Sequence, residues 1–358
     1  MNKKQIYVTV AAAIALSLLS FILLYAQSAF LKLKNNNVGK TVFFNFADYE
    51  IKTIKILKPS GRITTLKKNT ENEWVVANCF DYPVDPQKIN TFLQELSSMK
   101  IIQNVYLDES ELSGLKLLPS KNKDKNSGSE IIISDDKGNV VFSIIAGVKR
   151  TDTIGNNQIS RGRYIYKTDV KRVFLVEEPL DEVNYRSRTW LNNKFVNIKN
   201  IKTVRLLENG KEIWNITRPD IDSKFVQPGK KANDDYNTEN IDKIVSSLEN
   251  LKFETVAAPS LTNTYTGLNN PRIVKVESFD NQTWQIYIGH QTKDTRYVRI
   301  EHIDNSNPTN NSSKPDKEWI YLINQNRITP LIQSAKELFK KDKKTPGLMN
   351  KMYSSPMS

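Results

Sequence analysis

The chain has 358 residues and a hydrophobic fraction of 39%, values that suit roughly two domains with buried cores. Cys79 is the single cysteine, which excludes an internal disulfide and a thiolate metal cluster within one chain. The net charge is +13, but the basic residues are interspersed with acidic ones. This dispersal favours a generally basic, solvated surface, and we expect no nucleic-acid partner.

An uncharged apolar segment runs from Ile6 to Ala26, directly after a pair of lysines. As a helix it would span about 31 Å, close to the hydrocarbon thickness of a bilayer. It predicts a transmembrane anchor within residues 1–30, with the amino terminus in the cytoplasm and the body outside the bacterial inner membrane. A cleaved signal peptide is the alternative, with Ala26 and Ser28 as the small residues at the cleavage site. The length of the apolar run favours the anchor.

The first soluble elements are two short strands followed by a helix. Residues 54–57 and 62–66 flank the turn signature Pro59-Ser60-Gly61. A helix is predicted to start after Asp85, which can cap it, with Pro86 at its first position. Its apolar side chains recur at helical spacing and must cover a sheet: Ile89, Phe92, Leu93, Leu96 and Met99.

The same landmarks return in the same order later in the chain. Residues 201–207 resemble residues 51–57, and a second helical stripe has identical spacing. A Gly-Leu pair, a strand that ends in glycine and an Arg-Tyr pair then follow in both halves. Such an ordered recurrence indicates an internal duplication. The matched residues are Ile241, Ile244, Val245, Leu248 and Leu251 for the stripe, Gly114 with Gly267, Gly147 with Gly289, and Arg163 with Arg296.

These patterns predict an α+β protein. An N-terminal transmembrane helix would be followed by two tandem duplicated modules, each a mainly antiparallel sheet with one packed helix. The modules would occupy residues 31–195 and 196–340, after the anchor in residues 1–30. Residues 341–358 lack an apolar pattern and predict a disordered tail.

No sequence motif identifies an active site. Gly39-Lys40-Thr41 resembles the end of a phosphate-binding loop, but Lys34 stands where that motif needs glycine. Ser97 and Lys100 have the spacing of a penicillin-binding nucleophile motif without its partner motifs. The two histidines, His290 and His302, have no metal-ligand spacing around them. We therefore assign no catalytic, cofactor or metal residues and expect a protein that is not an enzyme.

Four arginines lie close together in the sequence near the junction of the two repeats: Arg161, Arg163, Arg186 and Arg188. Guanidinium groups bind anions through paired N–H donors, so these residues form a candidate anion-binding group. Ordinary salt bridges to the neighbouring acidic residues are the alternative.

The landmarks also resemble a known family. The resemblance rests on Trp74, the helix opening Val84-Asp85-x-x-Lys88-Ile89, Gly147, and Tyr164 before the strand at residues 173–176. Together these residues resemble a bacterial envelope family catalogued as domain of unknown function 4340, over about residues 50–340. A weaker similarity extends to the auxiliary subunit of an ABC transport system associated with gliding motility. The resemblance brings no catalytic residues with it.

The expected function follows from the anchor and the resemblance. We expect a single-pass, periplasmic envelope protein of scaffold or accessory type, and the resemblance implies an auxiliary role beside membrane transporter subunits. An anchor would confine the body to the membrane plane and raise its effective concentration near such a partner. A binding module for an anionic envelope polymer or ligand is the alternative, and a cell-wall hydrolase is a more distant one.

Overall fold

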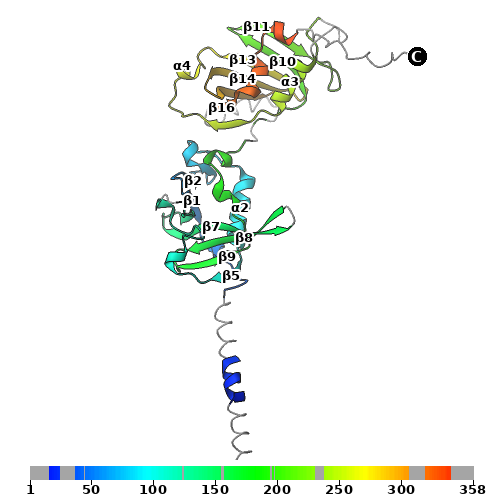
Figure 1. Ribbon diagram of the computed structural model, residues 1–358. Helices are drawn as coiled ribbons and strands as arrows, with labels where there is room; N and C mark the ends of the chain where they lie inside the picture. Colours follow the sequence, from blue (N-terminus) through cyan, green and yellow to red (C-terminus); the bar gives the residue numbers. More distant parts are fainter. Residues whose placement is uncertain are drawn as a thin grey trace, which may run out of the picture. The chain divides into compact units, whose positions relative to one another are not determined.

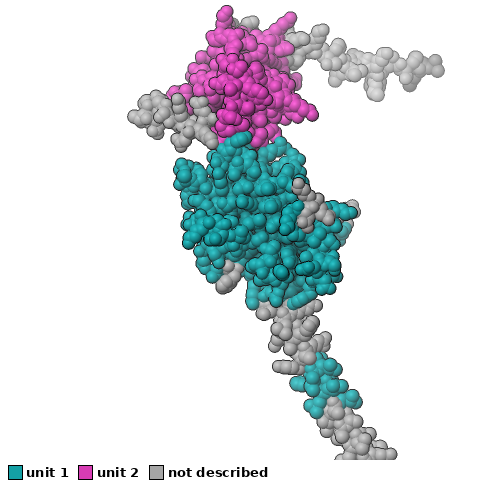
Figure 2. All heavy atoms as spheres, turned by 90° about the vertical axis from the view of Figure 1, so that its left-hand side faces the viewer, with its two compact units in different colours: residues 1–191 teal, residues 192–358 magenta. Residues whose placement is uncertain are grey.

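The computed structural model describes residues 16–24, 37–43, 45–122, 125–154, 157–193, 196, 198–229, 238–305 and 319–339. The chain divides into two compact units, residues 1–191 and residues 192–358, which Figure 2 shows in different colours. Each unit is built around one antiparallel sheet (Figure 1).

The first unit contains a nine-stranded sheet in the order β4-β3-β2-β1-β6-β7-β8-β9-β5. Alternate side chains of the central strands are buried, as in β1, where Ile54 and Ile56 are fully enclosed. The strands are β1 (Ile51–Leu57), β2 (Ile63–Lys68), β3 (Trp74–Val76), β4 (Tyr82–Pro83), β5 (Ile101–Val105), β6 (Ser129–Asp135), β7 (Val140–Ile154), β8 (Asn157–Lys167) and β9 (Arg172–Val176).

Helix α2 (Pro86–Ser98) lies between β4 and β5 in the chain and buries Ile89, Phe92 and Leu96. The side chain of Asp85 accepts a hydrogen bond from the backbone N–H of Gln87 at 3.0 Å, which caps the helix. Short 3₁₀ turns complete the unit: η1 (Phe46–Asp48), η2 (Ala77–Cys79), η3 (Glu109–Glu111), η4 (Ser120–Asn122), η5 (Asp181–Asn184) and η6 (Ser187–Trp190).

The second unit contains a seven-stranded sheet in the order β11-β10-β13-β14-β15-β16-β12. Its strands are β10 (Ile201–Glu208), β11 (Lys211–Thr217), β12 (Phe253–Val256), β13 (Arg272–Ser278), β14 (Gln282–Gln291), β15 (Thr295–Asp304) and β16 (Ile320–Asn324). Its helical segments are α3 (Thr238–Glu249), α4 (Asn263–Thr266), α5 (Gln325–Ile328), η8 (Thr329–Ile332) and α6 (Ala335–Leu338).

The two sheets share a strand order. The run β2-β1-β6-β7-β8-β9-β5 of the first matches β11-β10-β13-β14-β15-β16-β12 of the second, position by position. Three register shifts also recur at matched places, between β1 and β6 as between β10 and β13, between β7 and β8 as between β14 and β15, and between β5 and β9 as between β12 and β16. Strand order does not dictate such irregularities, so the sequence repeat extends to backbone geometry.

The predicted α+β class is wrong. The described residues form two mainly antiparallel sheets with few helices, and the second unit carries several short helical segments rather than one packed helix. The strands are long, with β7 at 15 residues and β8 at 11. A regular apolar stripe draws attention to a helix, but the sixteen strands contain more of the described residues than the helical segments do.

Only part of the predicted transmembrane helix lies within the described residues. No helix among the described residues is long and apolar enough to cross a membrane. Residues 16–24 are helical, and the rest of the segment from Ile6 to Ala26 lies outside the described residues. The predicted tail, residues 341–358, lies outside them as well.

Candidate functional site

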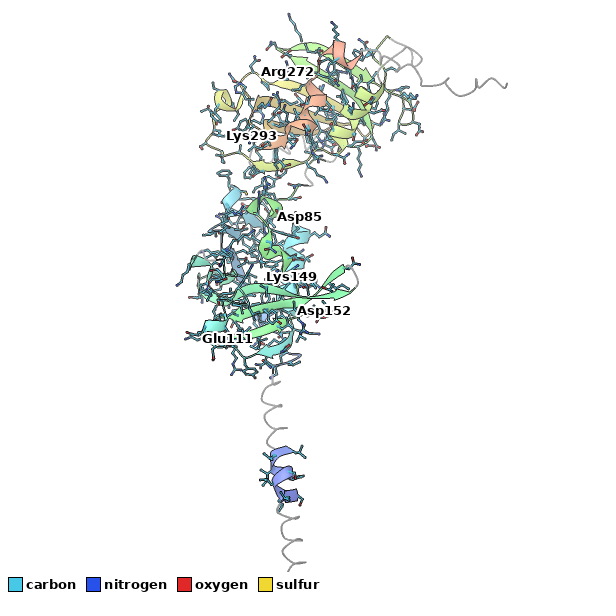
Figure 3. The ribbon with its side chains drawn as sticks, in the orientation of Figure 1. Asp85, Glu111, Lys149, Asp152, Arg272 and Lys293 are labelled. Atoms are coloured by element: carbon cyan, nitrogen blue, oxygen red, sulfur yellow. The ribbon has the colours of Figure 1, made fainter. Side chains whose placement is uncertain are left out.

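The structure places the four candidate arginines in different surroundings. Arg161 in β8 forms an ion pair at 3.0 Å with Asp152 of β7, which is labelled in Figure 3. Arg163 is 6% exposed and donates to the carbonyl oxygens of Pro179 at 2.6 Å and Gly147 at 2.9 Å. Arg186 and Arg188 are exposed and lie at the start of η6 and within it. Arg163 therefore has a structural role that its sequence position does not reveal.

The second sheet repeats the arrangement around Arg163. Arg296 of β15 donates to the carbonyl oxygen of Gly289 at 3.2 Å. A Cβ on Gly147 would lie 2.2 Å from the carbonyl oxygen of Leu115, and one on Gly289 would lie 2.1 Å from that of Thr266. In both sheets a glycine lets a loop approach the strand, and an arginine binds the carbonyl of that glycine. Burial lowers the pKa of both guanidinium groups.

Three glutamates from two distant parts of the chain lie close together, and the charge of one of them, Glu182, also acts on Arg163. Glu95 comes from α2, Glu178 follows β9, and Glu182 belongs to η5. Burial raises the pKa of Glu95 to about 7, and the charge of Glu182 and a hydrogen bond with its carboxyl group add to the effect. Burial also raises the pKa of Glu178. The Glu95 carboxyl group therefore holds its proton up to about neutral pH.

Basic and aromatic groups surround this carboxyl cluster. Lys149 of β7 forms an ion pair with Asp181, the residue before Glu182. Tyr185 lies on the other side, and burial together with the charge of Glu182 raises its pKa. The Tyr185 ring contacts Trp190, whose indole is fully buried and lies with its ring centre 5.4 Å from that of Phe92. The carboxyl cluster is thus partly shielded from solvent, and its Glu95 can gain or lose a proton near neutral pH.

A second polar cluster lies at the turn between β1 and β2. Lys58 donates to the carbonyl oxygen of Asn184 at 2.7 Å and to that of Tyr185. Burial lowers the pKa of the Lys58 ammonium, and the charges of Arg62 and Arg186 lower it further. Of the four predicted arginines, only Arg186 belongs to this group. We call Lys58, Arg62 and Arg186 the basic cluster.

Both histidines serve local structure. The ring of His290 lies against Gly267 and its Nδ1 is 3.1 Å from the carbonyl oxygen of Tyr265. His302 stacks on Trp284 at 4.8 Å between ring centres, and burial lowers its pKa. Among the residues that the structure describes, no group of three or more histidine, cysteine or acidic side chains is placed to hold a metal ion.

Sequence reasoning missed the carboxyl cluster. Glu95 lies outside the apolar stripe of its helix, which predicts a solvent-exposed side chain, whereas the side chain is half-buried. One signal was available, because residues 177–182 contain four acidic side chains within six positions. So many like charges in one short segment favour at least one shifted pKa. No pattern in the sequence, however, pairs that segment with α2.

Two antiparallel sheets of matched strand order define the class, a mostly β protein with an internal structural repeat. The chain belongs to the family described as Domain of unknown function (DUF4340), whose model matches residues 74–271. The match begins with β3 and ends just before β13, so it includes parts of both units. The resemblance inferred from the sequence is confirmed for this family. Searches of curated proteins and of solved structures found no significant match.

Proposed function

We propose that this protein is an envelope protein held at the bacterial inner membrane, with a body that acts as a non-enzymatic scaffold or accessory subunit. The amino terminus is cytoplasmic and the body periplasmic in this proposal. The uncharged segment from Ile6 to Ala26 supports the attachment, because its length suits a bilayer. The proposed partner is an ABC transport system, because the sequence landmarks have a weaker similarity to the auxiliary subunit of such a system.

The observation that carries the proposal is the edge of the first sheet at β5. Ile102 on this edge strand is 42% exposed, and Tyr106 just after it is 63% exposed. Exposed apolar and aromatic side chains at a sheet edge are typical of surfaces that receive another chain.

A pocket of about 380 Å³ adjoins the same edge. It is lined by β5, by η3 and by the hairpin of β8 and β9, and it includes Tyr106, Tyr166 and Phe174. An extended segment of a transporter subunit that followed β5 would place side chains in this pocket. The backbone of Ile101 at the start of β5 is already bonded to Gly39 and Lys40, so the free part of the edge begins after it. The occupant we propose is therefore a periplasmic segment of the transporter's membrane subunit, added beside β5 beyond Ile101.

Co-purification from native membranes tests the proposal. We expect the full chain, extracted in gentle detergent, to retain the membrane and ATPase subunits of an ABC transporter at moderate salt. Ile102→Asp should remove that association, because an ionised carboxylate cannot enter an apolar contact without a large desolvation cost. Ile159→Asp is the matched control, since Ile159 is also a strand isoleucine with 42% exposure.

Two results would contradict the proposal. One is the absence of transporter subunits from the purified wild-type sample. The other is equal loss of the association in both variants, which would mean that the β5 edge is not the contact. Release of the wild-type chain from membranes by alkaline carbonate would separately contradict the membrane attachment.

A further inference from the structure

The basic cluster is held together by fixed contacts from two parts of the chain. Lys58 and Arg62 stand on either side of the β1–β2 turn, where the backbone N–H of Lys58 donates to the carbonyl oxygen of Arg62 at 2.9 Å. The loop that carries Arg186 is bound to this hairpin twice. The ammonium group of Lys58 donates to the carbonyl oxygen of Asn184, and the hydroxyl oxygens of Thr64 and Ser187 lie 3.0 Å apart.

The cluster has an excess of positive charge. Within the part of the chain that the structure describes, no carboxylate lies at ion-pairing distance from Lys58, Arg62 or Arg186. Both arginines are exposed, so their guanidinium groups can reach a ligand. The mutual repulsion of three cations is unfavourable by itself, and an anion between them would remove it.

We propose that the basic cluster binds a phosphoryl group, with Arg62 and Arg186 as its two guanidinium donors and Lys58 as the fixed charge behind them. A phosphate monoester carries about −1.5 to −2 charges near pH 7 and has three acceptor oxygens. That charge matches three cations better than a single carboxylate does. Guanidinium groups bind such oxygens through two parallel N–H donors, which favours phosphate geometry.

This inference goes beyond the scaffold function and does not depend on it. The residues belong to the β1–β2 turn and to the loop before η6, whereas the proposed protein contact lies at β5. The phosphoryl group can come from a phospholipid headgroup or from a soluble phosphate ester. The experiment below therefore uses one probe for each source.

Arginine side-chain NMR of the full chain in detergent micelles tests the proposal. The Nε–Hε signals of Arg62 and Arg186, assigned from single variants, should shift on titration with inorganic phosphate at low salt. Mixed micelles with short-chain phosphatidic acid, a lipid phosphate monoester, supply the headgroup probe, and phosphatidylcholine micelles serve as its neutral reference. A shift with phosphate identifies a soluble ligand, and a shift with phosphatidic acid alone identifies a lipid headgroup.

Substitutions locate the site. Arg62→Gln and Arg186→Gln should each weaken binding about tenfold, the loss expected for one charge-assisted contact. Arg62→Lys and Arg186→Lys should retain part of the affinity, because they keep the charge. Arg161→Gln is the control and should bind like the wild type, since Arg161 is paired with Asp152. The proposal is overturned if neither probe shifts the signals, or if Arg161→Gln weakens binding as much as the other two.

Discussion

At the scale of single residues, the most unusual feature is the raised pKa of Glu95, whose carboxyl group lies close to that of Glu182. The two side chains come from α2 and η5, and they lie close together beside Tyr185, where they are partly shielded from solvent. One oxygen of each carboxyl group is buried without a hydrogen-bond partner among the described residues. Deprotonating both groups would leave two like charges in contact with little solvent between them.

The stability of the first unit should therefore depend on pH through Glu95. The folded-state pKa of about 7 lies above the ordinary value of 4.5, so the folded state holds this proton more tightly than the unfolded state. Stability should fall as the pH rises from about 4.5 to about 7 and then level off. Because Glu95 is only half-buried, we expect a loss of about 1–2 kcal/mol rather than the full value for such a shift.

Glu95→Gln tests this pH dependence. The variant should be more stable than the wild type above pH 7 and should lose most of the slope between pH 5 and pH 7. Urea denaturation at several pH values, followed by the fluorescence of the buried Trp190, provides the measurement. Glu50→Gln, at an exposed position, is the control. If the dependence of stability on pH were unchanged in Glu95→Gln, the raised pKa of Glu95 would have no effect on folding.

At the scale of elements, the repeated unit is a strand, a loop and an arginine. Gly147 and Gly289 occupy equivalent places in β7 and β14, and the carbonyl of each receives a hydrogen bond from Arg163 or Arg296. The glycine that ends this strand in the sequence pattern is thus the point where a loop packs closely against the strand. The Arg-Tyr landmark is the other half of the same contact, because its arginine lies on the adjacent strand.

Adding one methyl group at either glycine should destabilise its sheet. In Gly147→Ala and Gly289→Ala the new Cβ would meet a backbone carbonyl, which cannot rotate away. We expect a loss of about 1–3 kcal/mol in each variant. Gly114→Ala is the control, because its Cβ would lie 3.4 Å from the backbone oxygen of Glu111, an ordinary contact distance. Thermal or urea denaturation measures the effect, and a neutral Gly147→Ala would mean that the loop can move.

At the scale of the whole molecule, the two sheets share a run of seven strands in the same order and three matched register shifts. Central strands are bonded on both sides and carry the fully buried side chains, such as Ile131 of β6 and Val274 of β13. Terminal strands have a neighbouring strand on one side of the sheet. The free energy of local opening should therefore be highest in the central strands and lowest in the terminal strands of both sheets.

Hydrogen exchange of the intact chain tests this correspondence. We expect β6 and β13 to exchange slowly, β5 and β12 to exchange fast, and the rank order of protection to match between the two sheets. Exchange followed by mass spectrometry provides the measurement, with peptides from matched strands compared in pairs. Greater protection of β12 than of β13 would contradict the equivalence.

Local patterns in the sequence were sufficient for several parts of the structure. The turn at Pro59-Ser60-Gly61 and the cap at Asp85 depend on neighbours in the chain, and both are present. The membership of the family was also recognisable, because its landmarks are residues with local structural roles. The fold class was not, since periodicity identifies single elements and does not report how many strands join one sheet.

The sequence by itself determined the repeat, its landmarks and the absence of an internal disulfide. The tertiary structure alone decided the two polar clusters, because Glu95 meets Glu182, and Lys58 meets the loop of Arg186, across more than 80 positions of chain. It also separated Arg163 from Arg186, which the sequence had grouped. The physical reason is that charges interact through space and burial, whereas a linear pattern records only the spacing along the backbone.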